Sequence, residues 1–508
     1  MKLPLVNSII TWVMKKRIHQ MELFMKFPHD MQQEWFHRLI NEAKDTEWGK
    51  KYDFKSIHNY HTFSERLPLQ SYDDTCVYFE RIRKGEKNIL WPSEIKWFAK
   101  SSGTTSGKSK YIPVSEEAIH ECHFKGGKDM LSLYCNNFDG GNIFEGKSLM
   151  LGGSHTINQL SESVQEGDLS AIIIENLPYW VQLQRSPSKE TALLSEWEEK
   201  IHRMALESSQ ENITSLSGVP SWTLVLANKV LEITGKEHLQ EVWPNLELYM
   251  HGGVSFSPYE SSFRKLFPSS KLNYLEIYNA SEGFFGIQDQ PGRKDMLLML
   301  DYGIFYEFIP IDEIYKENPK VIDLSSVELH KTYAMVISTN AGLWRYKTGD
   351  TIIFTSTYPY RIRITGRTKH FINSFGEELM IGNAEEALEQ AFKTCGGIIR
   401  DYTVAPLFMD NGKSGAHEWL IEFSEMPNSI EQFAKVLDNN LQAINSDYEA
   451  KRYKDMILSP IRLHIAKEGL FYQWMKRKEK LGGQHKVPRL VNNREYMEEL
   501  LKLQHEIS

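Results

Sequence analysis

The segment from Ser101 to Lys110 (SSGTTSGKSK) has the residue types of a loop that binds phosphate. Small residues let the backbone turn several N–H groups toward one point, while hydroxyls and lysines add donors and positive charge. The segment is not a Walker A loop, because three residues separate Gly103 from Gly107 and that motif requires four. A polar surface loop is the alternative. The residues expected to bind phosphate are Ser101, Ser102, Gly103, Thr104, Thr105, Ser106 and Lys110.

Three later segments combine glycine with acidic or basic residues. They are 278–283 (YNASEG), 346–350 (YKTGD) and Gly366-Arg367, which is followed by 375–378 (FGEE). With the first loop they resemble, in order and separation, the motifs of the adenylate-forming superfamily. That superfamily contains acyl-CoA synthetases, luciferases and nonribosomal-peptide adenylation domains. Each segment alone is a weak signal, whereas the ordered set is a strong one.

Within the superfamily, the chain most resembles the plant acyl-acid amido synthetases that conjugate auxin and jasmonate, and their bacterial relatives. The SSGT opening, the YNASE and YKTGD segments and 484–489 (QHKVPR) carry this resemblance, which extends from about residue 20 to about 495. One departure is Lys347, at a position that is often Arg in the plant enzymes. Lysine lacks the bidentate fork of arginine, so a two-bond ion pair is not expected there.

The resemblance implies ATP and Mg²⁺ as cofactors, and the residue chemistry agrees with it. Joining a carboxylate to ATP brings two anions together, so their charge must be neutralised and their atoms aligned. Glu282 is a hard oxygen ligand for Mg²⁺, which usually takes one or two carboxylates plus nucleotide oxygens. An ordinary loop acid is the alternative. Ser281 is placed to donate a hydrogen bond to the α-phosphate.

The adenosine half of the nucleotide has its own candidates. The ring of Tyr278 offers a flat face for adenine, and a core tyrosine is the alternative. A carboxylate can accept hydrogen bonds from both ribose hydroxyls, a role that the resemblance implies for Asp350; a turn-capping aspartate is the alternative. Glycines after a strand would let a purine approach the backbone, although a plain turn is also possible. These residues are Gly252 and Gly253, with Val254 as a neighbour.

Two basic residues are expected to act from the C-terminal part of the chain. The resemblance implies that Lys486, in a loop between glycines and Pro488, swings into the site and bridges substrate and nucleotide oxygens. A surface lysine is the alternative. Arg367 lies at the expected domain junction, where it would contact the nucleotide or support a hinge. Rotation of the C-terminal domain between the two half-reactions is what the superfamily implies.

The predicted activity is therefore a ligase reaction in two steps. A carboxylic acid and ATP give an acyl-adenylate and pyrophosphate, and an amine, expected to be an amino acid, then displaces AMP to give an amide. One alternative is an acyl-CoA synthetase, which would form a thioester. The other is a nucleotide-binding protein without turnover. Both the acid and the acceptor stay open, and Tyr179, Trp180 and Trp222 are candidate pocket aromatics. His155 and His251 follow predicted strands and are expected to be structural, with a place in the wall of the site as the alternative.

The elements that must position these residues follow from the apolar runs. Short runs at 148–151, 171–174, 246–250 and 275–278 are typical of buried strands. Helical patterns at 190–209 and 221–234 separate some of them, which indicates an α/β arrangement. Residues 297–310 and 333–365 are rich in β-formers and indicate an antiparallel sheet or barrel. Residues 17–95 are expected to be mostly helical.

A domain boundary is expected near 366–370. Beyond it the pattern predicts a helix at 384–395, a strand at 417–423, a helix at 428–445, a strand at 461–466 and a basic helix at 468–480. The predicted fold class is α/β. It comprises a large N-terminal domain (1–367) with an antiparallel β-barrel-like subdomain, and a small mobile α+β C-terminal domain (368–508).

Composition narrows the class of protein. The chain has 508 residues and a formal net charge of −8, which argues against a nucleic-acid partner. Its four cysteines lack the spacing of a zinc site or a disulfide framework. Residues 5–14 predict an amphipathic helix packed on the domain, with a membrane-surface contact as the alternative. No apolar run is long enough to span a bilayer, and we expect a cytoplasmic protein.

Overall fold

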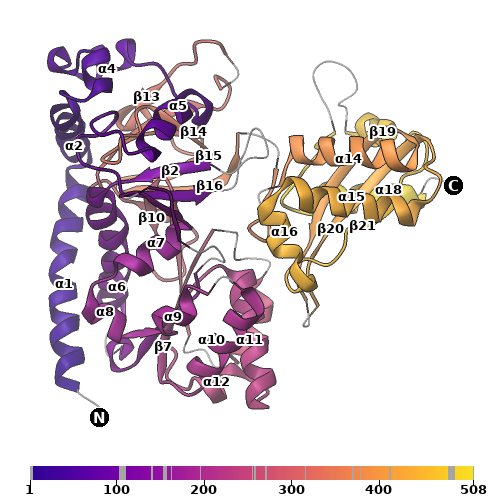
Figure 1. Cartoon of the computed structure of the whole chain (residues 1–508), viewed down its shortest axis with the longest axis horizontal. Helices are drawn as coiled ribbons and strands as arrows, with labels where there is room; N and C mark the ends of the chain where they lie inside the picture. Colours follow the sequence, from indigo (N-terminus) through magenta and orange to yellow (C-terminus); the bar gives the residue numbers. More distant parts are fainter. Residues whose placement is uncertain are drawn as a thin grey trace.

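The computed structural model describes residues 4–101, 110–138, 141–152, 157–161, 163–194, 196–253, 256, 259–268, 272–314, 316–368, 371–377, 379–410, 413–478 and 487–506. It has a large lobe built from the N-terminal three quarters of the chain and a smaller C-terminal lobe beside it (Figure 1). Strands and helices alternate along much of the chain, which confirms the predicted α/β class.

A group of helices precedes the first strand, as the sequence predicts. α1 runs along one edge of the large lobe (Figure 1) and packs on α6. Its Arg17 is buried and forms ion pairs with Asp129 of α6 at 2.8 Å and with Asp301 at 2.7 Å. The expected packing of this helix on the domain is thereby confirmed. The helices before the first strand are α1 (Pro4–Lys26), α2 (Pro28–Ala43), α3 (Glu47–Lys51), α4 (Tyr60–Arg66) and α5 (Tyr72–Arg83), and α6 (Lys125–Asn137) follows the first two strands.

One large mixed sheet positions most of the predicted site residues. Its strand order over the described residues is β13-β12-β14-β15-β16-β11-β10-β9-β8-β7-β3-β6. The strands from β6 to β9 pair in parallel. They are β3 (Lys147–Met150), β6 (Arg185–Ser186), β7 (Ile213–Ser217), β8 (Leu248–Gly252) and β9 (Asn273–Ala280). The predicted strands at 148–151, 246–250 and 275–278 therefore exist, with bounds shifted by one to two residues.

The rest of this sheet is antiparallel and follows the predicted β-rich stretch. These strands continue the parallel ones as one sheet. They are β10 (Gly283–Ile287), β11 (Met296–Leu298), β12 (Ile304–Pro310), β13 (Ile322–Asp323), β14 (Thr332–Thr339), β15 (Tyr346–Thr357) and β16 (Tyr360–Arg367). Long aromatic and β-branched side chains fill both faces here, which explains why alternating polar positions are scarce.

The predicted strand at 171–174 is wrong, because these residues lie in helix α7 (Leu169–Asn176). Ala171, Ile172 and Ile174 are all buried, so the helix is apolar around most of its circumference. A short apolar run of this kind has no periodicity that separates a buried strand from a buried helix. The β-branched isoleucines favoured a strand, and tertiary packing overrode that preference.

Other helices lie between the parallel strands. The predicted helix at 190–209 is interrupted, and Glu196 caps its second part by accepting hydrogen bonds from the N–H groups of Glu198 and Glu199. α10 and α11 cover the face of the sheet that carries Leu149, Leu216 and Tyr249. The helices are α8 (Tyr179–Leu183), α9 (Lys189–Ala192), α10 (Trp197–Ser209), α11 (Pro220–Thr234), α12 (Leu239–Val242) and α13 (Glu260–Leu266).

A second, smaller sheet frames the predicted phosphate loop. Its strand order is β2-β1-β5-β4, and β1 and β2 pair antiparallel. Its strands are β1 (Trp97–Ser101), β2 (Lys110–Val114), β4 (Asn158–Gln159) and β5 (Gln165–Gly167). The sequence did not predict this sheet, whose strands are short and separated by long connections.

The C-terminal lobe contains a sheet of order β19-β20-β21 and a small pair, β17-β18. All five elements predicted here are present, whereas β17, β18, β19, α16 and α18 were not predicted. The elements are β17 (Phe371–Ile372), β18 (Leu379–Met380), α14 (Ile381–Cys395), β19 (Ile398–Leu407), β20 (Ala416–Glu425), α15 (Ile430–Ile444), α16 (Ser446–Arg452), β21 (Arg462–Ile465), α17 (Leu470–Arg477) and α18 (Glu495–Glu506). Within the residues that the structure describes, no helix is both long and apolar enough to cross a membrane.

Candidate active site

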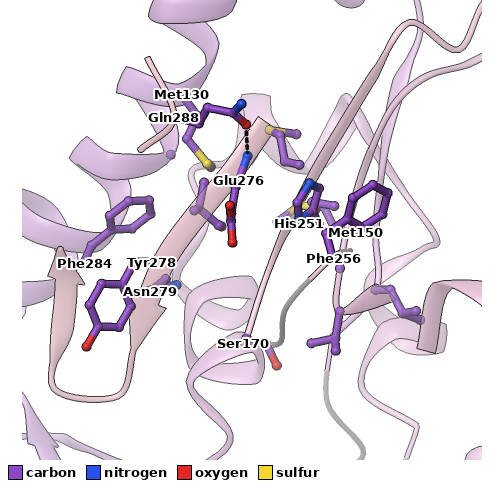
Figure 2. Close-up of a pocket in the computed structure, with 18 of the residues that line it drawn as sticks. Met130, Met150, Ser170, His251, Phe256, Glu276, Tyr278, Asn279, Phe284 and Gln288 are labelled. Carbon is purple, nitrogen blue, oxygen red and sulfur yellow. Dashed lines mark hydrogen bonds between the residues drawn. The ribbon is translucent and has the colours of Figure 1, made fainter. Parts of the chain in front are cut away.

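A cavity of about 2230 Å³ opens beside the carboxyl ends of the parallel strands. Seven of the predicted site residues line it: Ser101, Gly253, Tyr278, Ser281, Glu282, Asp350 and Arg367. They come from β1, β9, β15 and β16, from the turn after β9 and from the residue that follows β8, so the fold gathers residues that are far apart in sequence. Figure 2 shows part of the wall, where Tyr278 and Asn279 of β9 lie close to Phe284 of β10.

Asp350 is held in a defined position by two neighbours. It pairs in register with Arg367 on the adjacent strand, and the Arg367 Nε donates to Asp350 Oδ1 at 2.5 Å. The hydroxyl of Tyr278 donates to Asp350 Oδ2, also at 2.5 Å. Burial, and then the charge of Asp350, raise the pKa of Tyr278 well above its ordinary value. The tyrosine therefore keeps its proton and serves as a donor.

Glu282 lies in the turn between β9 and β10, at the mouth of this cluster. Burial raises the pKa of its carboxyl, while the positive charges of Lys110 and Arg367 act in the opposite direction. Asp350 raises the same pKa, so the two carboxylates are close enough to repel. A site in which two carboxylates repel each other binds a cation well. Among the described residues there is no cluster of three or more His, Cys, Asp or Glu side chains that could hold a metal ion.

The predicted phosphate loop joins two paired strands. Ser101 ends β1, Lys110 begins β2, and the two residues are register partners. Lys110 is 9% exposed and its ammonium lies 5.6 Å from the centre of the Tyr72 ring. The loop between them lies outside the described residues, and so do the predicted Val254 and Lys486. The loop residues concerned are Ser102, Gly103, Thr104, Thr105 and Ser106.

The two glycines at the end of β8, Gly252 in the strand and Gly253 directly after it, are required by the local geometry. A Cβ on Gly252 would lie 2.4 Å from the carbonyl oxygen of Ile277 on the neighbouring strand, so no side chain fits there. Gly253 has a φ of +81°, in the left-handed region that side chains disfavour. Gly253 lines the cavity, and Gly252 sets the close approach of β8 to β9 directly behind it.

Histidine and aromatic side chains form another part of the wall. His251 is buried, and burial lowers its pKa to about 3, so its imidazole is neutral at physiological pH. It stacks on Phe256 with ring centroids 4.2 Å apart (Figure 2). His251 thus lines the cavity, and its buried Nδ1 has no hydrogen-bond partner, whereas a structural role was expected for it. His155 lies outside the described residues. Trp222 lines the cavity, whereas Tyr179 is 76% exposed and does not.

Several cavity residues were missed by the sequence reasoning. Glu276 points into the cavity between Tyr278 and His251 (Figure 2), and burial raises the pKa of its carboxyl. Its position two residues before Tyr278 places both on the same face of β9, which is a signal that alternation could have given. The Glu276 N–H donates to Gln288 Oε1 at 2.9 Å. Arg185 was also missed, because no local motif surrounds it.

The C-terminal lobe closes one side of the cavity. Lys451 of α16 lines it, and its ammonium lies 4.2 Å from the centre of the Trp222 ring in the large lobe. The Tyr259 hydroxyl donates to the Ser374 carbonyl across the same boundary at 2.5 Å. Val487 is buried in this lobe, and the neighbouring Pro488 carbonyl accepts a hydrogen bond from Thr403 of β19. The segment directly after Lys486 is thus anchored to the C-terminal lobe.

Comparison with known proteins adds to this geometry. The GH3 family N-terminal domain matches residues 17–272, the GH3 family central domain matches residues 297–367 and the GH3 family C-terminal domain matches residues 382–495. The chain belongs to the GH3 family. The three matches cover most of the sequence, and the first alone covers half of it. The resemblance to acyl-acid amido synthetases noted from the motifs is thereby confirmed.

Named members of the GH3 family are similar along nearly their whole length. The chain is 23% identical to the indole-3-acetic acid-amido synthetase GH3.4 of Arabidopsis thaliana, over 94% of this chain and 92% of the relative. It is 22% identical to the 4-substituted benzoates-glutamate ligase GH3.12 of Arabidopsis thaliana, over 85% of this chain and 87% of that protein. These relatives are amido synthetases, which join an acid to an amine.

Solved structures share the fold. The GH3.15 acyl acid amido synthetase superposes with a TM-score of 0.62 at 17% identity, over 97% of this chain and 96% of that one. A 2-hydroxyisobutyryl-CoA ligase in complex with its acyl-AMP and coenzyme A superposes with a TM-score of 0.57 at 11% identity, over 94% and 92%. The GH3 chain described here therefore has the fold of acyl-adenylate-forming ligases.

Proposed function

We propose that this GH3 family protein activates a carboxylic acid with ATP and transfers the acyl group to an amine, with an amino acid as the expected acceptor. The observation that carries the proposal is the convergence of Tyr278, Ser281, Glu282, Asp350 and Arg367 at one end of a single large cavity. The rest of that cavity is mostly apolar, which suits the body of an organic acid.

The proposed ribose site is Asp350. A carboxylate has about four lone-pair directions, and the bonds from Tyr278 and Arg367 occupy only two of them. The remaining directions can accept both ribose hydroxyls. Since Tyr278 and Arg367 fix the carboxylate beforehand, binding the nucleotide requires little reorganisation. The ring of Tyr278 would then lie against adenine, and the close backbone at Gly252 and Gly253 would leave room for the purine.

The proposed phosphate and metal site is the group of Ser101, Lys110, Ser281 and Glu282. Lys110 supplies positive charge and Ser281 a hydroxyl donor. Glu282 would hold Mg²⁺ together with the nucleotide's own oxygens, which is why a cluster of three protein ligands is unnecessary. Bound there, the cation would offset the phosphate charge that otherwise repels the incoming carboxylate. The loop residues 102–106 and Lys486 keep the roles predicted from the sequence.

The proposed reaction has two steps. A carboxylate oxygen of the acid forms a bond to the α-phosphorus of ATP, and the bond to the bridging oxygen breaks, releasing pyrophosphate. The amine nitrogen then forms a bond to the acyl carbon, AMP leaves and the nitrogen loses a proton. Lys486 would stabilise the negative charge that develops in the first step. The large cavity holds both reactants while water is excluded from the mixed anhydride.

Two further parts of the proposal concern domains and location. We propose that residues 1–367 form the catalytic body and residues 368–508 a lid that moves between the two steps. The polar contacts between the lobes, such as the bond from Tyr453 to Glu196 at 3.0 Å, are of the kind found at interfaces that open. A cytoplasmic location stays a prediction from the sequence.

A two-stage assay tests the proposal. Pyrophosphate release is measured with ATP, Mg²⁺ and a panel of organic acids, and the products formed with amino acids and with coenzyme A are identified by mass spectrometry. Acid-dependent pyrophosphate release followed by an amide product is expected. A thioester instead of an amide would indicate an acyl-CoA synthetase. Binding of ATP without pyrophosphate release for any acid would indicate a nucleotide-binding protein without turnover.

A further inference from the structure

Arg185 is a buried cation that faces the cavity without a counter-ion. It forms the start of β6 and lines the cavity, and only 3% of its surface is exposed. Its Nε and Nη1 atoms are buried and have no hydrogen-bond partner. Burial lowers the pKa of the guanidinium, while the negative charges of Glu190 and Glu207 raise it. A buried charge without a partner destabilises the fold.

The other buried arginines of the described residues all have carboxylate partners. Arg17 pairs with Asp129 and Asp301, and Arg345 pairs with Glu307 at 2.9 Å. Arg361 and Arg452 pair with Asp289 and Asp438 at 2.5 and 2.8 Å. Each of these four arginines thus has a carboxylate that balances its charge. Arg185 differs from them because it lines a cavity that a ligand can enter.

The surroundings of Arg185 favour an anion. Ser148 of β3 is its register partner, Ser215 of β7 is the next residue in the same row, and both line the cavity. Register neighbours point to the same face of a sheet, so two hydroxyls accompany the guanidinium. Lys200 is also buried close by, since the charge of Arg185 contributes to its lowered pKa of about 8. Asp168, which acts in the opposite direction on Lys200, offsets part of this charge.

Arg185 lies at the end of the cavity remote from the nucleotide cluster. Four strand spacings separate β6 from β9, which is roughly 19 Å across the sheet. Outside the nucleotide cluster, the lining of the cavity is mostly apolar and includes residues of α1, α6, α7 and α8. Among them are Ile10, Met14, Met130, Ile174 and Val181. A ligand that reaches from the nucleotide to Arg185 thus has an extended apolar body.

We propose that Arg185 binds a second carboxylate, carried by the acid substrate at the end opposite to the carboxylate that is activated. The substrate class is then an elongated apolar acid with an anionic group at each end. This inference rests on the proposed adenylation of an acid. The acceptor amino acid also carries a carboxylate, but its nitrogen must reach the acyl carbon at the other end of the cavity, so its carboxylate is too distant from Arg185.

The test compares acids that differ only in the second carboxylate. Acid-dependent pyrophosphate release is measured for straight-chain monocarboxylic acids and for α,ω-dicarboxylic acids of the same lengths, with wild-type protein, Arg185→Met and Arg185→Lys. The wild type is expected to prefer the diacid roughly tenfold or more in kcat/KM at the best chain length. Arg185→Met is expected to lose that preference and Arg185→Lys to keep part of it. Gln184→Ala, a neighbouring uncharged cavity residue, is the control and should keep the wild-type ratio.

The outcomes separate this inference from the proposed function. Adenylation of monoacids with no diacid preference, or with the same preference in Arg185→Met, would overturn the assignment of Arg185. A change in the selectivity between glutamate and glutamine as acceptors, with the acid ratio unchanged, would overturn the assignment to the acid. Absence of pyrophosphate release with every acid would instead contradict the proposed adenylation. Arg185→Met is expected to fold like the wild type, because the substitution removes no ion pair, and thermal unfolding checks this.

Discussion

The two halves of the large sheet differ in whether their buried arginines have a carboxylate partner. In the antiparallel half, Arg345 is paired with Glu307 at 2.9 Å and Arg361 with Asp289 at 2.5 Å, all of them buried. In the parallel half, Arg185 is equally buried and has two unpaired nitrogens. These two ion pairs do not line the cavity, so a ligand bound there does not contact them. The difference indicates that the paired arginines of the antiparallel half support the fold, whereas Arg185 of the parallel half is available to a ligand in the cavity.

The candidate nucleotide site lies where the two halves contribute together. Tyr278 comes from the last parallel strand, while Asp350 and Arg367 come from two adjacent antiparallel strands. The bond from Tyr278 to Asp350 joins the halves across the sheet. The rigid half thus sets the position of the carboxylate, and the open half supplies the ring and the strand ends around it.

The largest expected effect is on stability in the support. Arg345→Met removes one partner of a buried pair and leaves Glu307 as a buried charge. Its free energy of unfolding should fall by about 3–5 kcal/mol. Arg185→Met, in the parallel half, removes a charge that has no partner and should lose little or gain stability. Urea denaturation of both variants measures the difference. Equal losses of unfolding free energy in the two variants would contradict the difference between the two halves of the sheet.

The next effect is on catalysis at the junction. Glu282→Gln keeps the size of the side chain but removes the charge proposed to hold the cation. Acid-dependent pyrophosphate release should fall about 10²- to 10³-fold, as for loss of one transition-state contact. Glu328→Gln is the matched control, since Glu328 is an exposed acid in the antiparallel half. Wild-type rates in Glu282→Gln would remove this residue from the site.

Lys486 tests whether the C-terminal part completes the site. Lys486→Ala should reduce adenylation by roughly 10²-fold while the thermal unfolding temperature changes little. The rate is measured as pyrophosphate release, and Lys476→Ala serves as a control in the same lobe. An unchanged rate in Lys486→Ala would rule out the assigned role and leave adenylation to the two halves of the sheet.

A smaller effect is expected from pH. The folded-state pKa of Glu282 is raised by burial above the usual 4.5. Its contribution to the stability of the unliganded fold is therefore full at low pH and is lost as pH rises through the folded pKa. The cation needs the ionised form, so Mg²⁺-dependent activity should fall about tenfold per pH unit below that pKa. A pH–rate profile with its acid limb at or below 4.5 would contradict this.

The sequence predicts those site residues that lie together in short motifs. Ser281 and Glu282 come three and four residues after Tyr278, and Asp350 follows a glycine, so residue type and spacing carried the information. The turn expected at Asp350 is wrong, because this residue lies in strand β15. Their meeting in one cavity was expected from the order of the motifs. The residues of the loop at 102–106 could be named in the same way, although they lie outside the described residues.

Other features depend on packing between distant segments, which a single sequence does not reveal. Arg185 is a candidate binding residue because it pairs in register with Ser148 and because its buried nitrogens have no carboxylate partner. Neither property can be predicted from the residues next to it in the sequence. The segment 171–174 was predicted as a strand because its apolar run has no period, and only its packing makes it a helix. Strand β19 was missed for the opposite reason, since polar residues interrupt its first half.

The central claim is that this GH3 family protein forms an acyl-adenylate, and trapping that intermediate tests it most directly. Hydroxylamine is added to the wild type with ATP, Mg²⁺ and a library of acids that includes paired mono- and dicarboxylic acids, and hydroxamates are identified by mass spectrometry. We predict an ATP-dependent hydroxamate from at least one acid, reduced in Glu282→Gln and Lys486→Ala. ATP binding without a hydroxamate from any acid would contradict the account.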